Sequence, residues 1–293
     1  MKYPALLAVV TAAFAAPQAN VVFKSGVSLV RIDVEAVDVN GHVVPGLKQD
    51  DFRILDEGVA QIPGNFSFDE EPLDLILLFD RSGSMKGKLL SVVRATELGF
   101  HELHKGDRVS VWTFNDESMA ALPFTEDLQA VNEAIVLRVP EFGFRGGSKP
   151  EMAAVEAVRE FQSASNTRRK RAIVIVTNKS GRGASETAGV HEMWEENAVV
   201  SELVLGDGAQ TKLLESSGHA FIDRTGGASI VAGNPGEAFR DVVHYVRSGY
   251  TMYYAMPDAA TGSERRVQVE LTPEAAKRLP NVRIRARSGY VVP

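Results

Sequence analysis

Asp80, Ser82 and Ser84 stand on alternate residues of one short stretch. In a tight loop, this spacing can direct a carboxylate and two hydroxyls towards a single point. Hard oxygen ligands suit Mg²⁺, and they suit Mn²⁺ or Ca²⁺ with less selectivity. A metal ion that meets only one protein carboxylate stays electrophilic, so it can accept a carboxylate from another molecule. The stretch therefore predicts a divalent-cation site that is open to a partner.

The neighbouring residues place this stretch at an edge where ligands bind. The run Leu73–Phe79 is short and predominantly apolar, which predicts a strand buried on both faces, as in a parallel sheet. From Lys88 onward, apolar residues recur at helical spacing. Asp80 and the serines therefore lie in a strand-to-helix loop at the carboxyl end of a strand, where open α/β sheets bind their ligands.

The middle of the chain repeats this strand-and-helix pattern. Strands are predicted over 108–114, 120–125, 172–177 and 199–205, and helices over 128–136, 151–161, 186–198 and 237–246. This alternation is typical of an α/β fold with a doubly wound, mostly parallel sheet of the Rossmann-like kind. Pro123 favours an antiparallel edge position for 120–125.

The two ends of the chain read as β structure instead. Strand patterns fill 21–68, and they return over 250–256, 265–271 and 282–287. Neither arm has enough strands for a core of its own. We therefore expect the N-terminal and C-terminal arms to pair with each other in one small β-sandwich beside the α/β domain.

The motif of Asp80, Ser82 and Ser84 resembles the metal-ion-dependent adhesion site (MIDAS) of the von Willebrand factor A (VWA) domain family. Other segments are similar to bacterial secreted VWA proteins of the acidobacterial type, namely Val-Pro-Gly-Leu at 44–47, Asp-Phe-x-Ile at 51–54 and Ala-Arg-x-Gly-Tyr at 286–290. The resemblance thus covers most of the chain, with its most specific motif in the loop after residue 79.

The resemblance also implies a ligand set and a cofactor. Ser148 stands where the family usually has threonine, and it keeps the hydroxyl. Asn178 stands where the family has an aspartate that holds the metal through water, and it keeps only a neutral amide. The implied metal residues are Asp80, Ser82, Ser84, Ser148 and Asn178, with Mg²⁺, or Mn²⁺ or Ca²⁺, as cofactor. The predicted partner-binding rim is Arg81, Lys86, Arg145, Lys149 and Lys179, whose positive charge would weaken cation binding and attract an anionic partner.

The resulting domain prediction has four parts. Residues 1–15 are a signal peptide, with Lys2 before an apolar segment and Ala13-Phe14-Ala15 as the cleavage motif. An N-terminal β arm spans 20–68, a VWA domain spans 72–248, and a C-terminal β arm spans 249–293. The protein is therefore expected to be exported, to the periplasm or the cell exterior, without a transmembrane segment. The chain contains no cysteine, so its fold is expected to be held by its core alone.

Composition and motifs favour a binding protein over an enzyme. The 293 residues carry a net charge of -6, which argues against a nucleic-acid partner. Gly83–Lys88 is one residue short of a phosphate-binding loop, and Leu89 replaces the Mg²⁺-binding hydroxyl. A phosphatase with Asp80 as nucleophile lacks its usual second carboxylate, because Ser82 occupies that position. The acidic residues Asp50, Asp51, Asp56 and Glu57 are interpreted as a solvated turn rather than a Ca²⁺ site.

We therefore predict an exported, non-enzymatic protein that mediates protein–protein interaction or adhesion through a metal-ion-dependent site. The alternative is a VWA scaffold that has lost its metal and binds a partner through another surface. A phosphoester-hydrolysing enzyme is the less favoured third prediction. Asn178 and the neighbouring lysines distinguish the first two predictions, because they favour a scaffold that has lost its metal.

Overall fold

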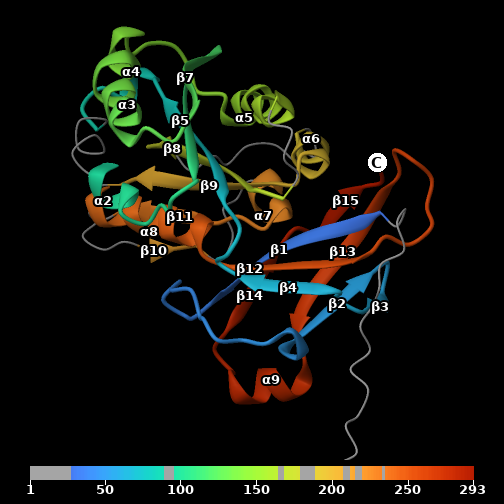
Figure 1. Cartoon of the computed structure of the whole chain (residues 1–293). Helices are drawn as coiled ribbons and strands as arrows, with labels where there is room; N and C mark the ends of the chain where they lie inside the picture. Colours follow the sequence, from blue (N-terminus) through green and yellow to red (C-terminus); the bar gives the residue numbers. More distant parts are fainter. Residues whose placement is uncertain are drawn as a thin grey trace, which may run out of the picture.

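The computed structural model describes residues 28–88, 96–163, 168–178, 189–206, 212–214, 220–232 and 235–293, and its centre is a seven-stranded sheet (Figure 1). The strand order is β10-β11-β9-β8-β5-β6-β7, with parallel pairing from β11 to β6 and antiparallel pairing at both edges. The strands are β5 (Leu73–Asp80), β6 (Arg108–Phe114), β7 (Ser118–Thr125), β8 (Lys170–Thr177), β9 (Ala198–Leu205), β10 (Lys212–Leu213) and β11 (Ser229–Ala232).

Strand β5 is buried along its whole length because helices cover both faces of the sheet. Leu75, Leu77 and Phe79 point into one apolar core, whereas Ile76 and Leu78 point into the other. The first core is closed by α2 (Thr96–Phe100), α3 (Leu128–Glu133), the π-helix η3 (Ala134–Arg138), α4 (Val139–Glu141) and α8 (Pro235–Arg247). The second is closed by α5 (Pro150–Val158), η4 (Arg159–Ser163), α6 (Val190–Glu195) and α7 (Ala220–Thr225).

The remaining strands form two antiparallel sheets that pack face to face. One has the order β14-β1-β12-β4 and the other the order β15-β13-β2-β3. Their bounds are β1 (Leu29–Val37), β2 (Phe52–Asp56), β3 (Val59–Gln61), β4 (Asn65–Phe68), β12 (Tyr250–Ala255), β13 (Glu264–Leu271), β14 (Arg283–Ala286) and β15 (Gly289–Val291). The short helices η1 (Gln49–Asp51) and α9 (Pro273–Arg278) flank them.

Strands from both ends of the chain alternate in these sheets. β1 lies between β12 and β14, with Ile32 opposite Met252, and β2 pairs with β13. Ile32, Met252 and Ile54 are all fully buried in the shared core. The predicted fold class, a mostly parallel α/β sheet with a β-sandwich built from both arms, is confirmed.

Asp56 corrects the interpretation of the acidic stretch around it. Its side chain is fully buried, where it accepts hydrogen bonds from the hydroxyls of Tyr254 and Tyr290, both at 2.9 Å. Arg265 neutralises it at 2.7 Å. Asp56 is therefore a buried counterion of the sandwich and not part of a solvated turn. Sequence alone missed it because its partners lie about two hundred residues further along the chain.

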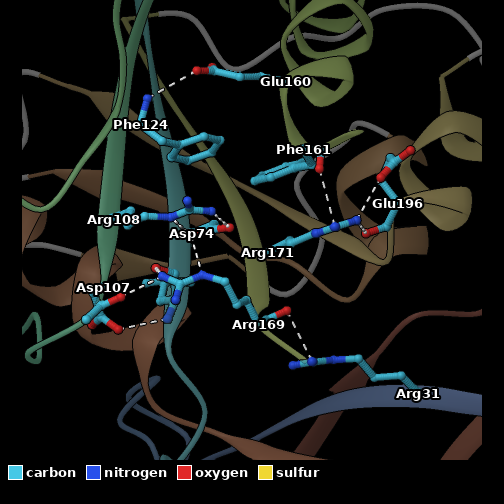
Figure 2. A network of polar contacts seen from close by, with 12 residues as sticks. Arg31, Asp74, Asp107, Arg108, Phe124, Glu160, Phe161, Arg169, Arg171 and Glu196 are labelled. Carbon is cyan, nitrogen blue, oxygen red and sulfur yellow. Dashed lines mark hydrogen bonds and ion pairs between the residues drawn. The ribbon is translucent and has the colours of Figure 1, made fainter. Parts of the chain in front are cut away.

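A buried charge network lies at the amino ends of the parallel strands, facing the sandwich (Figure 2). Asp74 is fully buried and binds both Arg108 and Arg169, at 2.7 Å and 2.6 Å. The carbonyl of Arg169 in turn accepts a hydrogen bond from Arg31 of β1 at 3.1 Å. The two arginines, which are partly exposed, neutralise the buried carboxylate of Asp74. Through the contact with Arg31, the network joins the sheet to the sandwich.

The predicted signal peptide, residues 1–15, lies outside the described residues, as does the first part of the N-terminal arm. Both stay predictions. The first strand of the parallel sheet begins at Leu73, and α8, the last helix on its face, ends at Arg247.

Candidate functional site at the carboxyl edge of the sheet

Asp80 is the last residue of β5, and its carboxylate organises the loops around it. The side chain is fully buried. One oxygen, Oδ1, accepts a hydrogen bond from the backbone N–H of Ser82 at 2.6 Å. The other, Oδ2, accepts from the hydroxyls of Ser148 at 3.0 Å and Thr177 at 2.7 Å. A buried carboxylate with this many donors is well satisfied, and it draws three separate segments together.

Ser84 and Asn178 form the outer part of the same cluster. The Ser84 hydroxyl donates to Asn178 Oδ1 at 3.0 Å, and Asn178 Nδ2 donates to the backbone carbonyl of Ser84 at 3.1 Å. The hydroxyls of Ser82 and Ser84 lie 3.2 Å apart. The structure thus brings together all the predicted metal residues: Asp80, Ser82, Ser84, Ser148 and Asn178.

Backbone hydrogen bonds hold the loops in this arrangement. The N–H of Arg81 donates to the carbonyl of Phe114 at the end of β6, at 2.6 Å, and the N–H of Arg145 donates to the carbonyl of Arg81 at 3.0 Å. The N–H of Lys149 reaches the carbonyl of Asn115 at 3.2 Å. The hydroxyl positions are therefore fixed by main-chain contacts between loops and not only by side-chain packing.

Arg81 departs from its predicted role on the partner-binding rim. Its guanidinium donates to the carbonyls of Phe142 and Gly143, at 2.8 Å and 3.2 Å, and lies over the Phe142 ring with 5.4 Å to the centroid. Only 5% of the residue is exposed. Burial, and then the nearby Arg145, lower the pKa of this guanidinium. Arg81 is therefore a buried structural cation that links two loops, and this corrects the prediction of a freely exposed rim charge.

The rest of the rim is mixed in charge rather than uniformly positive. Lys86 and Arg145 are exposed, as predicted for rim residues. The ammonium of Lys149 lies 4.0 Å from Oδ1 of Asp116, and Oδ2 of the same carboxylate accepts a hydrogen bond from the N–H of Gly147 at 3.0 Å. Lys88, on the loop after Asp80, donates to the carbonyl of Leu205 at 3.0 Å. Lys179 lies outside the described residues.

A cleft of about 350 Å³ opens beside the second loop of the site. It is lined by Arg81, Asn115, Asp116, Glu117, Met119, Phe142, Arg145 and Gly146. Acidic, basic and apolar groups thus share this surface. A partner that docks at this edge would therefore contact carboxylates as well as cationic side chains.

Thr177 and Asp116 are the residues that sequence reasoning left without a role at the site. The parallel register pairs Phe79 with Val176, so the next residues along the two strands, Asp80 and Thr177, stand opposite each other. That register follows from aligning the two apolar runs, so it could have indicated Thr177. Asp116 gave no such signal, because its contact with Gly147 joins loops 31 residues apart.

The donor chemistry of the cluster fits a hard divalent cation. It offers one carboxylate and three hydroxyls, from Asp80, Ser82, Ser84 and Ser148, and these are oxygen ligands of the kind that Mg²⁺ prefers. Arg81 opposes a cation less than predicted, because its guanidinium is bound to the carbonyls of residues 142 and 143. Among the described residues, no group of three or more His, Cys, Asp or Glu side chains could hold a metal, so any site here depends on hydroxyls.

The family model of the von Willebrand factor type A domain matches residues 75–181. This span includes every element that supplies the cluster. The chain contains a von Willebrand factor type A domain. No curated protein sequence matches the chain significantly. The narrower resemblance to acidobacterial secreted VWA proteins stays a prediction.

The solved structures that match the chain include bacterial proteins. An aerotolerance-related membrane protein from Bacteroides fragilis is 16% identical, with 59% of this chain and 98% of that chain covered and a TM-score of 0.46. A von Willebrand factor type A protein from Catenulispora acidiphila is 14% identical, with coverages of 92% and 75% and a TM-score of 0.48. The conserved hypothetical protein BatB from Bacteroides thetaiotaomicron is 19% identical, with coverages of 60% and 87% and a TM-score of 0.37.

In the described part of the chain, none of the helices combines the length and the apolar character that crossing a bilayer requires.

Proposed function

We propose that this VWA domain binds a protein partner at the carboxyl edge of its sheet, through a divalent cation held by the Asp80 cluster. The observation that carries the proposal is the convergence of a buried carboxylate with the hydroxyls of Ser82, Ser84 and Ser148. Because Asp80 brings a single negative charge, a bound Mg²⁺ would keep its demand for a further anionic ligand. A carboxylate of the partner is the group that meets this demand.

Each residue of the cluster has its own part in this proposal. Asp80, Ser82, Ser84 and Ser148 would hold the cation, which supplies Lewis acidity towards the partner's carboxylate. Thr177 keeps Asp80 oriented through its 2.7 Å hydrogen bond. Asn178 positions the Ser84 hydroxyl and offers a neutral amide towards metal-bound water. Lys86 and Arg145 remain the exposed cations that would face a partner.

The alternative function is a metal-free VWA scaffold, and one observation favours it. Ser84 and Asn178 close a reciprocal pair of hydrogen bonds, and both Asp80 oxygens already accept hydrogen bonds from protein donors. The cluster is thus satisfied by its own groups without the second carboxylate that the family usually has there. In this case the partner would bind through another surface.

We also retain export and a non-enzymatic role as proposals. Export rests on the sequence of residues 1–15. The absence of catalysis rests on the incomplete phosphate-loop and phosphatase motifs around Asp80. A phosphoester assay with Asp80→Asn as the comparison tests it, because turnover that this variant abolishes would favour the enzyme instead.

Calorimetric titration with MgCl₂ and MnCl₂ tests the metal site directly. Wild-type protein is expected to give a saturable heat that Asp80→Asn removes. Asp258→Asn, an exposed carboxylate of the sandwich, is the matched control and is expected to titrate like wild type. Thermal unfolding of each variant checks that the fold is kept. No saturable heat on folded wild-type protein would rule out the metal-dependent version.

Partner binding is tested by a pull-down from envelope extract with and without EDTA. A metal-dependent partner is expected to bind wild type and the Asp258 variant in Mg²⁺, and to be lost with EDTA or with Asp80→Asn. A partner retained under all these conditions would favour the metal-free scaffold.

A further inference from the structure

A second cleft, which shares no residue with the Asp80 cluster, opens between the VWA domain and the sandwich. Its volume is about 550 Å³. The VWA domain contributes Trp194 from α6 and Arg224 from α7, and the sandwich contributes Glu57, Glu264, Arg265, Arg266 and Ser288. Figure 1 shows α6 beside β15, where the two lobes meet. Clefts between domains are a preferred location for ligand sites.

Arg224 is held rigidly at the wall of this cleft. Its guanidinium carbon lies 4.5 Å from the centroid of the Trp194 ring, and Trp194 is only 4% exposed. The backbone carbonyl of Arg224 accepts hydrogen bonds from the Trp194 indole at 3.1 Å and from the N–H of Ser288 at 2.9 Å. A guanidinium fixed over an aromatic ring loses little freedom when it binds an anion.

Three charged residues of the cleft, one arginine and two glutamates, already have other partners. Arg265 is neutralised by the buried Asp56 at 2.7 Å. Glu57 Oε1 accepts a hydrogen bond from the backbone N–H of Arg266 at 2.6 Å, and Glu264 lies 3.3 Å from a ring nitrogen of His191. Within the ranges that the structure describes, no ion pair joins a carboxylate to the guanidinium of Arg224 or Arg266.

We infer that this cleft binds a carboxylate-bearing ligand, such as the free C-terminus of a peptide, between the guanidiniums of Arg224 and Arg266. The planar fork of a guanidinium matches the two oxygens of a carboxylate. Glu57 and Glu264 line the same cleft and repel additional negative charge. A single carboxylate on an otherwise neutral ligand therefore fits better than a doubly charged phosphate. This site does not depend on the metal site at Asp80.

The test is a nuclear magnetic resonance titration that follows the Trp194 indole N–H, with N-acetyl-trialanine as the probe. The free acid is expected to shift this resonance saturably, with a Kd in the millimolar range. The C-terminal amide of the same peptide and inorganic phosphate are expected to bind at least tenfold more weakly. Equal binding of acid and amide, tighter binding of phosphate, or no saturable shift would each overturn the assignment.

Two variants connect the binding to the named residues. Arg224→Gln and Arg266→Gln are each expected to raise the Kd of the free acid at least fivefold. Arg240→Gln, on the exposed side of α8, is the matched control and is expected to leave the Kd unchanged. Arg266 is exposed, so its variant decides the test even if Arg224→Gln lowers stability. Wild-type affinity in Arg266→Gln would show that the site does not use both arginines.

Discussion

Glu202 lies in the middle of β9 with only 1% of its surface exposed. Burial raises the pKa of its carboxyl group from 4.5 to about 7, and the nearby Asp223 adds to this rise. The folded protein therefore keeps a proton on Glu202 at pH values where the unfolded chain has released it. Substitution of Glu202 by Gln removes this titration and keeps a side chain of almost the same shape.

The sign and size of the effect follow from proton linkage. Between pH 4.5 and 7 the folded state binds the extra proton, so the free energy of unfolding falls as the pH rises. At 1.36 kcal/mol per pH unit, the rise of the pKa corresponds to about 3 kcal/mol lost across this window, as an upper bound. Above pH 7 the loss is complete and constant. Glu202→Gln is thus expected to match wild type near pH 4.5 and to be more stable by up to about 3 kcal/mol at pH 8.

Urea unfolding at half-unit steps from pH 4.5 to 8 measures this difference. Subtracting the free energy of unfolding of wild type from that of Glu202→Gln removes the contributions of the other titrating groups. One of these is Glu35, whose pKa is also raised to about 7 by burial. Glu237→Gln, an exposed glutamate of α8, is the control and is expected to show a flat difference. A flat difference for Glu202→Gln, or one that falls as pH rises, would refute the reasoning.

Three further predictions, two of them with a comparison variant, test the packing and the site. Asp74→Ala leaves the partly buried Arg108 and Arg169 without their buried counterion and is expected to cost about 3 kcal/mol in urea unfolding. The cost should be far larger than that of the partly exposed control Asp241→Ala, and equal costs would contradict the assigned network. Thr177→Val is expected to lower the free energy of unfolding by about 1–3 kcal/mol, because it removes a hydrogen-bond donor to Asp80. Thr113→Val is expected to be neutral or stabilising, because the buried Thr113 hydroxyl has no hydrogen-bond partner in the described part of the structure. A larger loss of stability in Thr113→Val than in Thr177→Val would contradict the assigned role of Thr177. If Asp80 holds a metal as proposed, Thr177→Val is also expected to weaken Mg²⁺ binding in calorimetry. Gly227→Ala would place a methyl group 1.7 Å from the carbonyl oxygen of Val200 and is expected to cost about 3 kcal/mol or more; a near-neutral effect on the thermal midpoint would show that the backbone can yield there.

Much of the site could be predicted because the spacing of Asp80, Ser82 and Ser84 carries its own information. An apolar run that ends in an oxygen-bearing loop predicts a site at the carboxyl edge, whereas Ser148 and Asn178 were predicted only from the resemblance to the VWA family. The side-chain hydroxyls then meet because parallel strands end at one edge. Thr177 was missed because its role depends on the exact register between β5 and β8, which loop motifs do not reveal.

The sequence by itself determined the features that depend on near neighbours: the doubly buried strands, the loop of Asp80, and the β character of both arms. Only the tertiary structure decided where the long charged side chains go. Arg81 turns away from the rim to the carbonyls of Phe142 and Gly143, and Asp56 becomes the buried counterion of Arg265. The physical reason is that a buried charge must find a partner, and the partner within reach is set by packing between segments far apart in the chain.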